Sequence, residues 1–552
     1  MSGYYVENFG CRATQADGAA LERQFEQRGM SRASTPAQAS VVVMNTCTVT
    51  ASADQDARAA IRRVRRQNPE AQIVVTGCYA QRAPAEIAAL PGVSLVIGNS
   101  HKHQLAEIVS THAQTSDLGL RTSDSAFIPL TTLTVATGSR EPEAESPIFV
   151  SDIFAHTELL AAPVFDAANE RTRPNLKVQD GCDNRCSFCV IPFVRGQSRS
   201  LSIERIVSEV NGLVKSGYRE VVISGINLGR WGRDLSGIRL PAAGFRSSLA
   251  DSEDVGPQTS DLSQIHESAV GSPMSDAFRT PEAESRNGLT SEVRSLTPDA
   301  LRRPRVESRK PTLPALIRAI LAETALEKLR ISSVEPMDWT DELISLVASS
   351  PRIAKHAHVP MQSGSDAVLR GMHRKYRPWH YREKIEKIRA AMPTAAIGAD
   401  VMVGFPGETD TEFEATRRMI EELPFTYLHV FTYSARPGTP AAAMPNQVPV
   451  HIARERNRVL RELAAGKKLR FMRSFVEKEI DAITLNVTGS HAGVEFTEAL
   501  TDNYLKLRMH GRHAPNQWLR TRIIDVVDGS LLGMNEIAIP SKNFAGACSF
   551  NS

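Results

Sequence analysis

Six apolar segments that alternate with helical patterns constrain the fold of this chain more than any other feature. The strand candidates span 175–180, 220–227, 328–336, 355–362, 396–406 and 426–434. The helical patterns between and after them span 203–216, 312–325, 340–349, 379–391, 410–422 and 450–476. Strands that alternate with helices form parallel sheets, and eight such units close a (β/α)₈ barrel. Six units in series therefore predict an α/β fold with an open, partial (β/α)₆ barrel.

A shorter series of the same kind opens the chain and predicts a parallel-sheet α/β domain. Its strand candidates span 4–10, 40–47 and 72–78, and its helical patterns span 14–28, 54–67 and 83–90. The strands lead directly to Cys11, Cys47 and Cys78. Ligands of parallel sheets bind beyond the carboxyl ends of the strands. We therefore expect these three thiols to lie at one edge of one sheet, where they could converge.

Three further segments depart from this alternation. Residues 111–150 are rich in Ser and Thr without a clear period, which predicts a linker or an addition to the first domain. Residues 241–310 are rich in Ser and Pro and contain only two aromatic residues. Such a segment buries too little apolar surface to offset its ordering entropy, so we expect disorder. After about residue 477, short β-rich segments separated by Gly, Asn and His predict a small antiparallel β barrel.

These changes set the expected domain boundaries of the 552-residue chain. The expected parts are an N-terminal domain at 1–112, a linker at 113–167, a barrel at 168–465 with the disordered insertion 241–310, a helix end with the small barrel at 466–541, and a tail at 542–552. A chain of this length holds roughly three or four domains at about 150 residues each.

Charge and hydropathy exclude several classes of protein. The net charge is only +3, from 65 Lys and Arg against 62 Asp and Glu, so any affinity for nucleic acid must come from local basic faces. No apolar run approaches the roughly 18 residues of a membrane span, and no signal-peptide pattern is visible. We therefore expect a cytoplasmic protein without membrane association. In that compartment, clustered cysteines are more often metal ligands than disulfides.

Three of the seven cysteines fall within eight residues, directly after the first predicted strand of the partial barrel. These are Cys182, Cys186 and Cys189. Their C-x₃-C-x₂-C spacing lets one loop wrap three thiolates around a single inorganic group. A structural zinc site uses four protein ligands, commonly in C-x₂-C pairs, and no fourth cysteine lies nearby. A four-iron cluster with one open iron suits three cysteines better. Zinc and three buried structural thiols remain as alternatives.

This motif, with an aromatic residue before its last cysteine, is similar to the signature of the radical S-adenosylmethionine (SAM) superfamily. Nine motifs in order resemble those of the methylthiotransferases: "FGCRATQADG", "NTCTVT", "TGCYAQ", "GCDNRCSFCVIPFVRGQSRS", "ISGINLGRWG", "ISSVEP", "HVPMQSGSDAVLRGMHRKY", "VMVGFPGET" and "VFTYSARPGTPAA". The resemblance covers nearly the whole chain apart from 111–150 and 241–310. It implies an N-terminal domain with three cysteines, a radical SAM barrel and a C-terminal RNA-binding β barrel called TRAM.

The resemblance also implies two 4Fe–4S clusters and SAM as cofactors. The barrel-loop cysteines would hold the cluster whose open iron binds SAM and whose electron cleaves it to a 5′-deoxyadenosyl radical. The three strand-end cysteines would hold a second cluster that takes part in sulfur delivery. One SAM molecule would donate the methyl group and another would yield the radical. No side-chain acid–base pair is therefore expected as the catalyst.

Polar residues near the predicted strand ends and basic residues elsewhere are further candidates. Those for the SAM pocket are Asn227, Ser333, Glu335, Gln362, Asp400 and Gly404. Glycine at the last position would allow close approach of the cofactor. Those for RNA binding are Arg195, Arg199, Lys506 and Arg508. Helix capping and turn chemistry are the competing explanations for each polar candidate taken singly.

The chain could resemble any of three methylthiotransferase subfamilies, which differ in their substrates. They modify isopentenyladenosine in tRNA, threonylcarbamoyladenosine in tRNA, or an aspartate of a ribosomal protein. The sequence after Cys11, Arg12–Ala13–Thr14, and the presence of Thr48 resemble the threonylcarbamoyladenosine enzymes. We therefore expect insertion of a methylthio group at C2 of N6-threonylcarbamoyladenosine, next to the anticodon at position 37.

The same resemblance implies the partners of the protein. These are tRNA, an electron donor such as flavodoxin or ferredoxin, and a sulfur donor. We expect the protein itself to be a monomer. A non-catalytic iron–sulfur RNA-binding protein is the alternative from another class. The intact cysteine loop and "GFPGET" argue against it.

Overall fold

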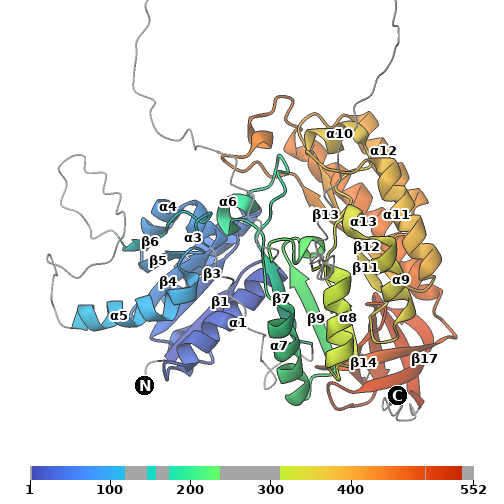
Figure 1. Ribbon diagram of the computed structural model, residues 1–552, viewed down its shortest axis with the longest axis horizontal. Helices are drawn as coiled ribbons and strands as arrows, with labels where there is room; N and C mark the ends of the chain where they lie inside the picture. The colour runs from blue at the N-terminus through green and yellow to red at the C-terminus, as the bar shows by residue number, and fades with distance from the viewer. Residues whose placement is uncertain are drawn as a thin grey trace, which may run out of the picture. The chain divides into compact units, whose positions relative to one another are not determined.

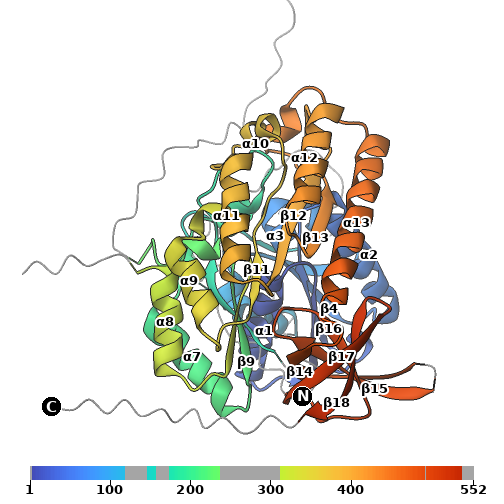
Figure 2. The same cartoon turned by 90° about the vertical axis from the view of Figure 1, so that its right-hand side faces the viewer.

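A computed structural model describes residues 3–117, 146–156, 159, 173–235, 311–491 and 493–537 (Figures 1 and 2). The predicted disordered insertion 241–310 and the tail 542–552 lie outside the described residues. No helix in the described part of the chain is long and apolar enough to cross a membrane.

The N-terminal region is a six-stranded parallel sheet with the strand order β2-β1-β3-β4-β5-β6. Its strands are β1 (Gly3–Asn8), β2 (Ser31–Arg32), β3 (Val41–Thr46), β4 (Gln72–Gly77), β5 (Val93–Gly98) and β6 (Ile148–Phe149). Its helices are α1 (Arg12–Glu26), α2 (Ala51–Gln67), α3 (Cys78–Arg82), α4 (Pro84–Ala88) and α5 (Leu105–Asp117). The three predicted strands are confirmed. The sequence analysis missed β5, and β6 adds an edge strand from within the predicted linker.

The central region carries six strands that alternate with helices, as the partial (β/α)₆ barrel predicts (Figure 1). The strands form two parallel sheets, in the orders β10-β9-β7 and β11-β12-β13, and an isolated bridge joins Leu329 to Ile353 between them. Its parallel strands are β7 (Asn175–Asp180), β9 (Glu220–Gly225), β10 (Lys328–Ile331), β11 (His356–His358), β12 (Ala396–Val403) and β13 (Tyr427–Thr432). A short strand, β8 (Arg199–Ser200), pairs antiparallel with β7. The helices are α6 (Ile191–Arg195), α7 (Ile203–Lys215), α8 (Leu313–Glu323), α9 (Asp341–Ser349), α10 (Asp366–Gly371), α11 (Pro378–Ala391), α12 (Asp410–Glu422) and α13 (Val450–Arg473).

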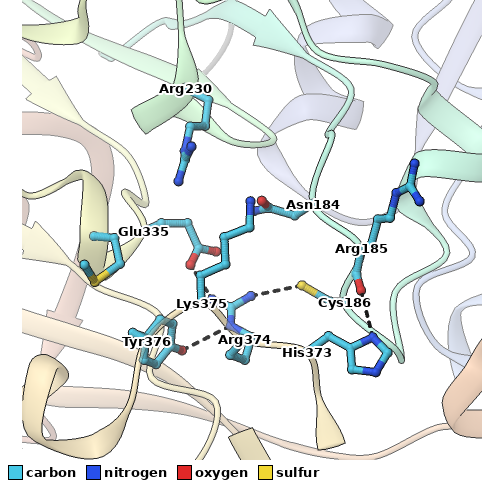
Figure 3. Close-up of a pocket in the computed structure, with 10 residues that line it drawn as sticks. Asn184, Arg185, Cys186, Arg230, Glu335, His373, Arg374, Lys375 and Tyr376 are labelled. Atoms are coloured by element: carbon cyan, nitrogen blue, oxygen red, sulfur yellow. Dashed lines mark hydrogen bonds and ion pairs between the residues drawn. The ribbon is translucent and has the colours of Figure 1, made fainter. Parts of the chain in front are cut away.

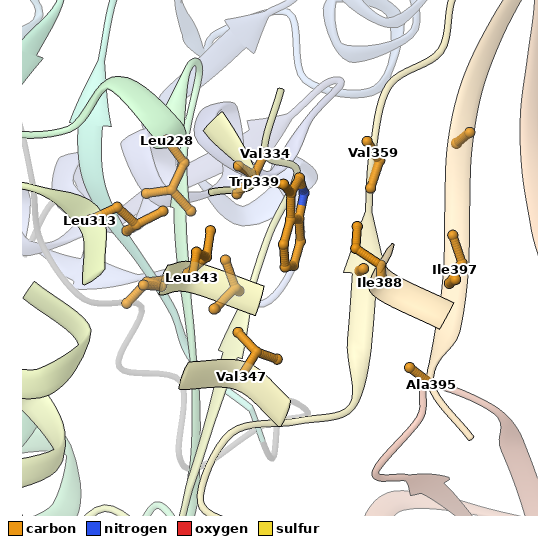
Figure 4. Close-up of a cluster of buried hydrophobic side chains, with 14 of the residues drawn as sticks. Leu228, Leu313, Val334, Trp339, Leu343, Val347, Val359, Ile388, Ala395 and Ile397 are labelled. Carbon is orange, nitrogen blue, oxygen red and sulfur yellow. The ribbon is translucent and has the colours of Figure 1, made fainter. Parts of the chain in front are cut away.

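The barrel strands bury one face against the helices and present polar side chains on the other. Apolar side chains of the strands, such as Ile397, and Val359 directly after β11 pack with helix residues such as Leu343 and Ile388 in one large buried cluster (Figure 4). Successive side chains of a strand point to opposite faces. The opposite face therefore carries the polar residues of the same strands, among them Lys177, Gln179, Glu220, Arg330, His356, His358 and Asp400.

The C-terminal region is a closed five-stranded β barrel in the order β14-β15-β16-β18-β17. Its strands are β14 (Glu479–His491), β15 (Val494–Thr501), β16 (Lys506–His510), β17 (Trp518–Val527) and β18 (Ser530–Ile537). The predicted small barrel is confirmed, although β16 and β18 pair parallel rather than antiparallel. The turn after β15 meets the central barrel, where Arg330 donates to the Asp502 carbonyl at 3.2 Å.

Candidate functional site

The barrel-loop cysteines lie directly after β7 in a loop that backbone hydrogen bonds hold from several sides. Gly181 begins the loop at φ +71°, and a Cβ there would lie 1.9 Å from the Gln197 carbonyl oxygen, so only glycine fits. The Cys182 amide donates to the Gly196 carbonyl at 3.1 Å. The Ser187 amide donates to the Met372 carbonyl at 3.2 Å. The loop is thus fixed between α6 and the segment after α10.

Three hydrogen-bond donors point at the sulfur atoms of this loop. The Asn184 amide lies 3.4 Å, and the Asn227 side-chain amide 3.6 Å, from Cys182 Sγ. The Arg374 guanidinium lies 3.2 Å from Cys186 Sγ and also pairs with Glu335. Burial lowers the pKa of Arg374, but Tyr376, Glu335 and Cys186 outweigh burial and raise this pKa well above its ordinary value. Donors of this kind stabilise a thiolate and orient it as a ligand.

Burial affects the acidity of the cysteines in this loop. It raises the pKa of Cys182 to about 11 and that of Cys189 to about 12. Binding of a metal group must therefore displace the protons of these thiols. Across the described ranges, no group of three or more His, Cys, Asp or Glu side chains is arranged to hold a metal ion. The role of the three loop cysteines as cluster ligands stays a prediction from their C-x₃-C-x₂-C spacing.

The structure brings the three strand-end cysteines together at the carboxyl edge of the N-terminal sheet. Cys11 precedes α1, Cys47 follows β3, and Cys78 begins α3. A Cβ on Gly10 would lie 2.9 Å from Cys47 Sγ, so the loop before Cys11 rests against Cys47. Burial raises the pKa of Cys47 to about 12, and the charges of Cys78 and Cys11 add to this shift. These contacts place Cys11 and Cys78 near Cys47, and the convergence of all three thiols on one group stays a prediction, as does their role as ligands.

The two groups of cysteines meet through α3 and α6. Cys78 packs with Val190 and Val194, which follow the barrel loop. The Asn99 side-chain amide donates to the Val194 carbonyl at 2.7 Å and lies 3.6 Å from Cys78 Sγ. One asparagine therefore links the N-terminal group of cysteines to the helix that follows the barrel group.

A buried charge cluster fixes the same junction, and it corrects the expectation for Arg195. Arg195 is 2% exposed, and its guanidinium contacts Asp180 at 3.0 Å and Asp17 at 3.1 Å. Asp17 of α1 also pairs with Lys102 at 3.1 Å and with Lys177 of β7. Burial would raise the pKa of Asp17, but these cations outweigh burial and lower its pKa to about 2. Arg195 therefore joins the N-terminal sheet to the barrel and is not available to an RNA phosphate.

The other RNA-binding candidates lie in different places. Arg199 is half-buried and donates to the carbonyls of Arg195 at 2.9 Å and His156 at 3.1 Å. Lys506 is exposed on the C-terminal barrel. Arg508, two residues on, is half-buried and pairs with Asp528 at 3.2 Å. Lys506 and Arg508 remain candidates for RNA contact, whereas Arg195 and Arg199 belong to the junction between the N-terminal sheet and the barrel.

Two of the six SAM-pocket candidates contact the cysteine loop or its arginine. Asn227 faces Cys182, and Glu335 pairs with Arg374. Ser333 is half-buried in the same loop as Glu335. Gln362 lies after β11, and its backbone amide donates to the carbonyl of Asp400 in the neighbouring strand β12 at 2.8 Å.

Gly404 differs from its expected role. A Cβ there would lie 2.6 Å from the Cβ of Ala453, so the close approach that this glycine allows is that of α13. The Gly404 amide donates to the buried carboxylate of Glu408 at 2.6 Å. Its positive φ of +77° explains the glycine without a cofactor.

Sequence reasoning did not single out three groups that shape the site. Arg374 lies in a motif already quoted, but only the fold shows its contact with Cys186. A polar chain crosses the barrel: the Tyr427 hydroxyl lies 2.6 Å from His356 Nε2 and 3.2 Å from His358 Nδ1. His358 in turn lies 3.2 Å from the Asp400 carboxylate. The two-residue spacing of the histidines on one strand was the available signal.

The buried Thr48 belongs to a third such group. Its hydroxyl donates to Asp54 at 2.6 Å and accepts from Arg82 and Arg436, each at 2.8 Å. Arg436 follows β13, so this contact ties the N-terminal region to the last barrel strand. Thr48 is therefore buried within this junction between the N-terminal region and the barrel.

A small pocket, with a volume of about 20 Å³, lies beside the cysteine loop (Figure 3). Its lining residues include Asn184, Arg185, Cys186, Arg230, Glu335 and Lys375. The pocket thus lies between Cys186 and the surface of the barrel.

Comparison with known proteins identifies two family regions in the chain. The uncharacterized protein family UPF0004 matches residues 3–98, and the radical SAM superfamily matches residues 296–420. The first match contains the three strand-end cysteines.

Similar proteins extend over nearly the whole chain. The chain is 31% identical to the threonylcarbamoyladenosine tRNA methylthiotransferase MtaB of Bacillus subtilis, over 93% of this chain and 91% of that protein. It is 30% identical to the enzyme of the same name from Aquifex aeolicus, over 94% and 99%. It is 29% identical to the tRNA-2-methylthio-N(6)-dimethylallyladenosine synthase of Novosphingobium aromaticivorans, over 89% and 88%.

Proposed function

The chain belongs to the radical SAM methylthiotransferases that modify tRNA, and from this premise we propose that its substrate is N6-threonylcarbamoyladenosine at position 37. The reaction would insert a methylthio group at C2 of the adenine. Two similar enzymes carry this substrate in their names. The similarity to a dimethylallyladenosine enzyme is nearly as high, so overall identity does not separate the two substrates. The local sequence Arg12–Ala13–Thr14 and Thr48 favours threonylcarbamoyladenosine.

The meeting of two cysteine groups at one junction is the observation that carries the proposed chemistry. We propose that Cys182, Cys186 and Cys189 hold a 4Fe–4S cluster that binds SAM. The three strand-end cysteines would hold a second cluster. When bound, these groups and SAM supply the radical, the sulfur and the methyl group.

The chain's own residues would orient and insulate these groups. Asn227 and Arg374 donate hydrogen bonds toward the sulfurs of Cys182 and Cys186. The pairing of Arg374 with Glu335 fixes the guanidinium in that position. Asn99 and the Asp17 cluster hold the two cysteine groups at a constant separation, because they join α1 and α3 to the barrel. A rigid, water-poor junction is the protein's contribution to radical chemistry of this kind.

The proposed partners follow from the reaction. tRNA is the substrate, and Lys506 and Arg508 of the C-terminal barrel are proposed to contact its backbone. A one-electron donor such as flavodoxin or ferredoxin and a sulfur donor complete the requirements. A cytoplasmic location fits all three partners.

The test compares two tRNA substrates with the purified, iron-loaded protein under anaerobic conditions. SAM, sulfide and dithionite are supplied, and tRNA nucleosides are analysed by liquid chromatography and mass spectrometry. We expect tRNA with threonylcarbamoyladenosine to gain the methylthio group and tRNA with isopentenyladenosine to stay unchanged. Conversion of the second tRNA alone would contradict the proposed substrate. Absence of 5′-deoxyadenosine in every reaction would favour a non-catalytic iron–sulfur protein.

A further inference from the structure

We propose that Thr14 is a positioning residue for the strand-end cysteines, because its hydroxyl donates a hydrogen bond to Cys11 and links this sulfur to the buried Arg195. The inference rests on the proposed function, since it treats Cys11 as a ligand of the second cluster. It goes beyond that function by assigning a neighbour that orients one ligand and tunes the potential of the cluster. No covalent bond forms or breaks in this role.

The Thr14 hydroxyl lies between a sulfur and a guanidinium. Its Oγ1 atom is 3.6 Å from Cys11 Sγ and 3.5 Å from Arg195 Nη2. A guanidinium can only donate, so the Thr14 oxygen accepts from Arg195. A cysteine that binds a metal group is a thiolate and has no proton to give. The hydroxyl hydrogen of Thr14 is therefore left to donate to the sulfur of Cys11.

The strand that leads to Cys47 fixes Thr14 in place. Thr14 lies on α1 and is 1% exposed. The Asn45 side-chain amide in β3 donates to the Thr14 carbonyl at 2.8 Å. The oxygen of the same side chain accepts from Lys102 at 3.1 Å, so Asn45 is itself held. A buried, β-branched side chain on a fixed backbone has few rotamers, and the hydroxyl therefore keeps its place.

The buried charges behind Thr14 include more positive than negative groups. Their ion pairs join the three cations Lys102, Lys177 and Arg195 to the two carboxylates Asp17 and Asp180. A buried charge is costly unless an opposite charge lies nearby. Thiolates that bind a metal group at this edge of the sheet would supply negative charge. The charge cluster is therefore suited to stabilise an anionic group held by the strand-end cysteines.

The end of α6 reaches two of these cysteines through polar side chains. Arg195 is the last residue of the helix and contacts Thr14. The carbonyl of Val194, the residue before it, accepts from the Asn99 side-chain amide at 2.7 Å. That amide also lies 3.6 Å from Cys78 Sγ. Two strand-end cysteines thus have a neighbouring donor that the same helix end holds, so the contact at Thr14 is part of a repeated arrangement.

Capping of α1 does not account for the contact. A capping side chain accepts from a backbone amide in the first turn of the helix. Cys11 is the N-cap residue of α1, but at this described helix end its side chain makes no capping hydrogen bond. The sulfur and the Thr14 hydroxyl therefore contact each other without completing the hydrogen bonds of the helix.

The experiment observes the N-terminal cluster alone, in the full-length, iron-loaded protein with Ala at the three barrel-loop cysteines. In this starting protein, Thr14→Val removes the hydroxyl and nearly keeps the shape, whereas Thr14→Ser keeps the hydroxyl. Thr416→Val is the matched control, because Thr416 of α12 is also buried and accepts from the Gly364 amide at 2.9 Å (Figure 1). Iron loss to EDTA is followed by absorbance, and the midpoint potential is followed by redox titration with electron paramagnetic resonance.

We expect Thr14→Val to speed iron loss about tenfold or more, since the outer partners of metal ligands contribute about 10–100-fold to metal affinity. The midpoint potential should become more negative, because the lost hydrogen bond stabilised the reduced cluster. Thr14→Ser should restore both values. Thr416→Val should leave both values unchanged, although it also removes a buried hydroxyl.

The outcomes decide the role of Thr14 first. Unchanged iron loss and potential in Thr14→Val, or equal shifts in Thr416→Val, would overturn this role. Shifts that Thr14→Ser fails to restore would assign the contact to packing and overturn it as well. A starting protein without any cluster would overturn both the second cluster and the role of Thr14.

A parallel assay of the protein with all its cysteines decides the proposed function. Methylthiolated tRNA from that protein, together with an unmoved potential in Thr14→Val, would overturn the role of Thr14 alone. The expected shifts without any methylthiolated tRNA or 5′-deoxyadenosine would contradict the proposed function and still support the role of Thr14.

Discussion

Replacing Asp17 by Asn should destabilise the junction between the N-terminal sheet and the barrel by about 3–5 kcal/mol, the usual cost of breaking a buried ion pair. Asp17 contacts Lys102 and Arg195 at 3.1 Å each and also pairs with Lys177. At an effective dielectric constant of about 20, each such pair attracts with about 5 kcal/mol. The desolvation of the carboxylate and the mutual repulsion of the cations offset most of this sum. Asn keeps the shape but leaves Lys177 and Arg195 with Asp180 as their carboxylate, and it leaves Lys102 with the side-chain oxygen of Asn45.

Urea unfolding of the metal-free protein, followed by circular dichroism, gives the free energy of unfolding directly. Asp56→Asn is the matched control, because Asp56 is exposed on α2 of the same region. Its change should stay within about 0.5 kcal/mol. A loss below about 1 kcal/mol for Asp17→Asn would refute the argument that this carboxylate holds the junction.

The same carboxylate predicts a pH dependence. The pKa of Asp17 is lowered from 3.8 to about 2, since three cations outweigh the effect of burial. A lowered pKa contributes stability that is present above the unfolded value and is lost as the pH falls through the folded value. The unaltered protein should therefore lose about 2 kcal/mol between roughly pH 4 and pH 2 that Asp17→Asn does not lose. Equal acid sensitivity of the two proteins would contradict the assignment.

Three further predictions concern other parts of the chain. Arg374→Gln removes the positive charge 3.2 Å from Cys186 Sγ, so the cluster's midpoint potential should become more negative. Redox titration followed by electron paramagnetic resonance measures this potential, and an unchanged value would show that the contact does not tune it. Arg330→Met removes the partner that contacts the buried Glu220 at 2.7 Å and leaves this carboxylate with Arg173 at 3.8 Å. The change should cost about 3 kcal/mol in urea unfolding, whereas adding Glu220→Leu should recover much of that loss. Replacing 241–310, which lies outside the described residues, by a short Gly/Ser linker should leave the melting temperature nearly unchanged, and a large drop would show that the segment packs.

Local patterns in the sequence were sufficient for most of the longer strands and helices, although β5 was missed. The positions of Cys11, Cys47 and Cys78 at strand ends follow from where the apolar runs stop. β7 begins and ends at the predicted residues, 175 and 180, between Pro174 and the positive-φ Gly181. The strand β6 has only two residues, too few to show any period.

Contacts between distant segments left no local signal. Arg195 seemed available to RNA because its partner Asp17 lies 178 residues earlier in the chain. Gly404 suggested a cofactor approach, whereas its neighbour, Ala453, lies on a helix that begins at Val450. In both cases the residue type indicated a specific contact, and only the fold shows that the partner is Asp17 for Arg195 and Ala453 for Gly404.

The most direct test of the central claim separates the roles of the two cysteine groups. Two triple variants to Ala are compared, one of Cys11, Cys47 and Cys78 and one of the barrel-loop cysteines. The intact protein should hold about eight irons, and each variant about four.

Both 5′-deoxyadenosine and methylthiolated tRNA are quantified in the same reaction with dithionite. The account predicts that the N-terminal variant still forms 5′-deoxyadenosine but makes no methylthiolated product, and that the barrel variant forms neither. Methylthiolated product from the N-terminal variant, or 5′-deoxyadenosine from the barrel variant, would contradict the assignment of the two groups.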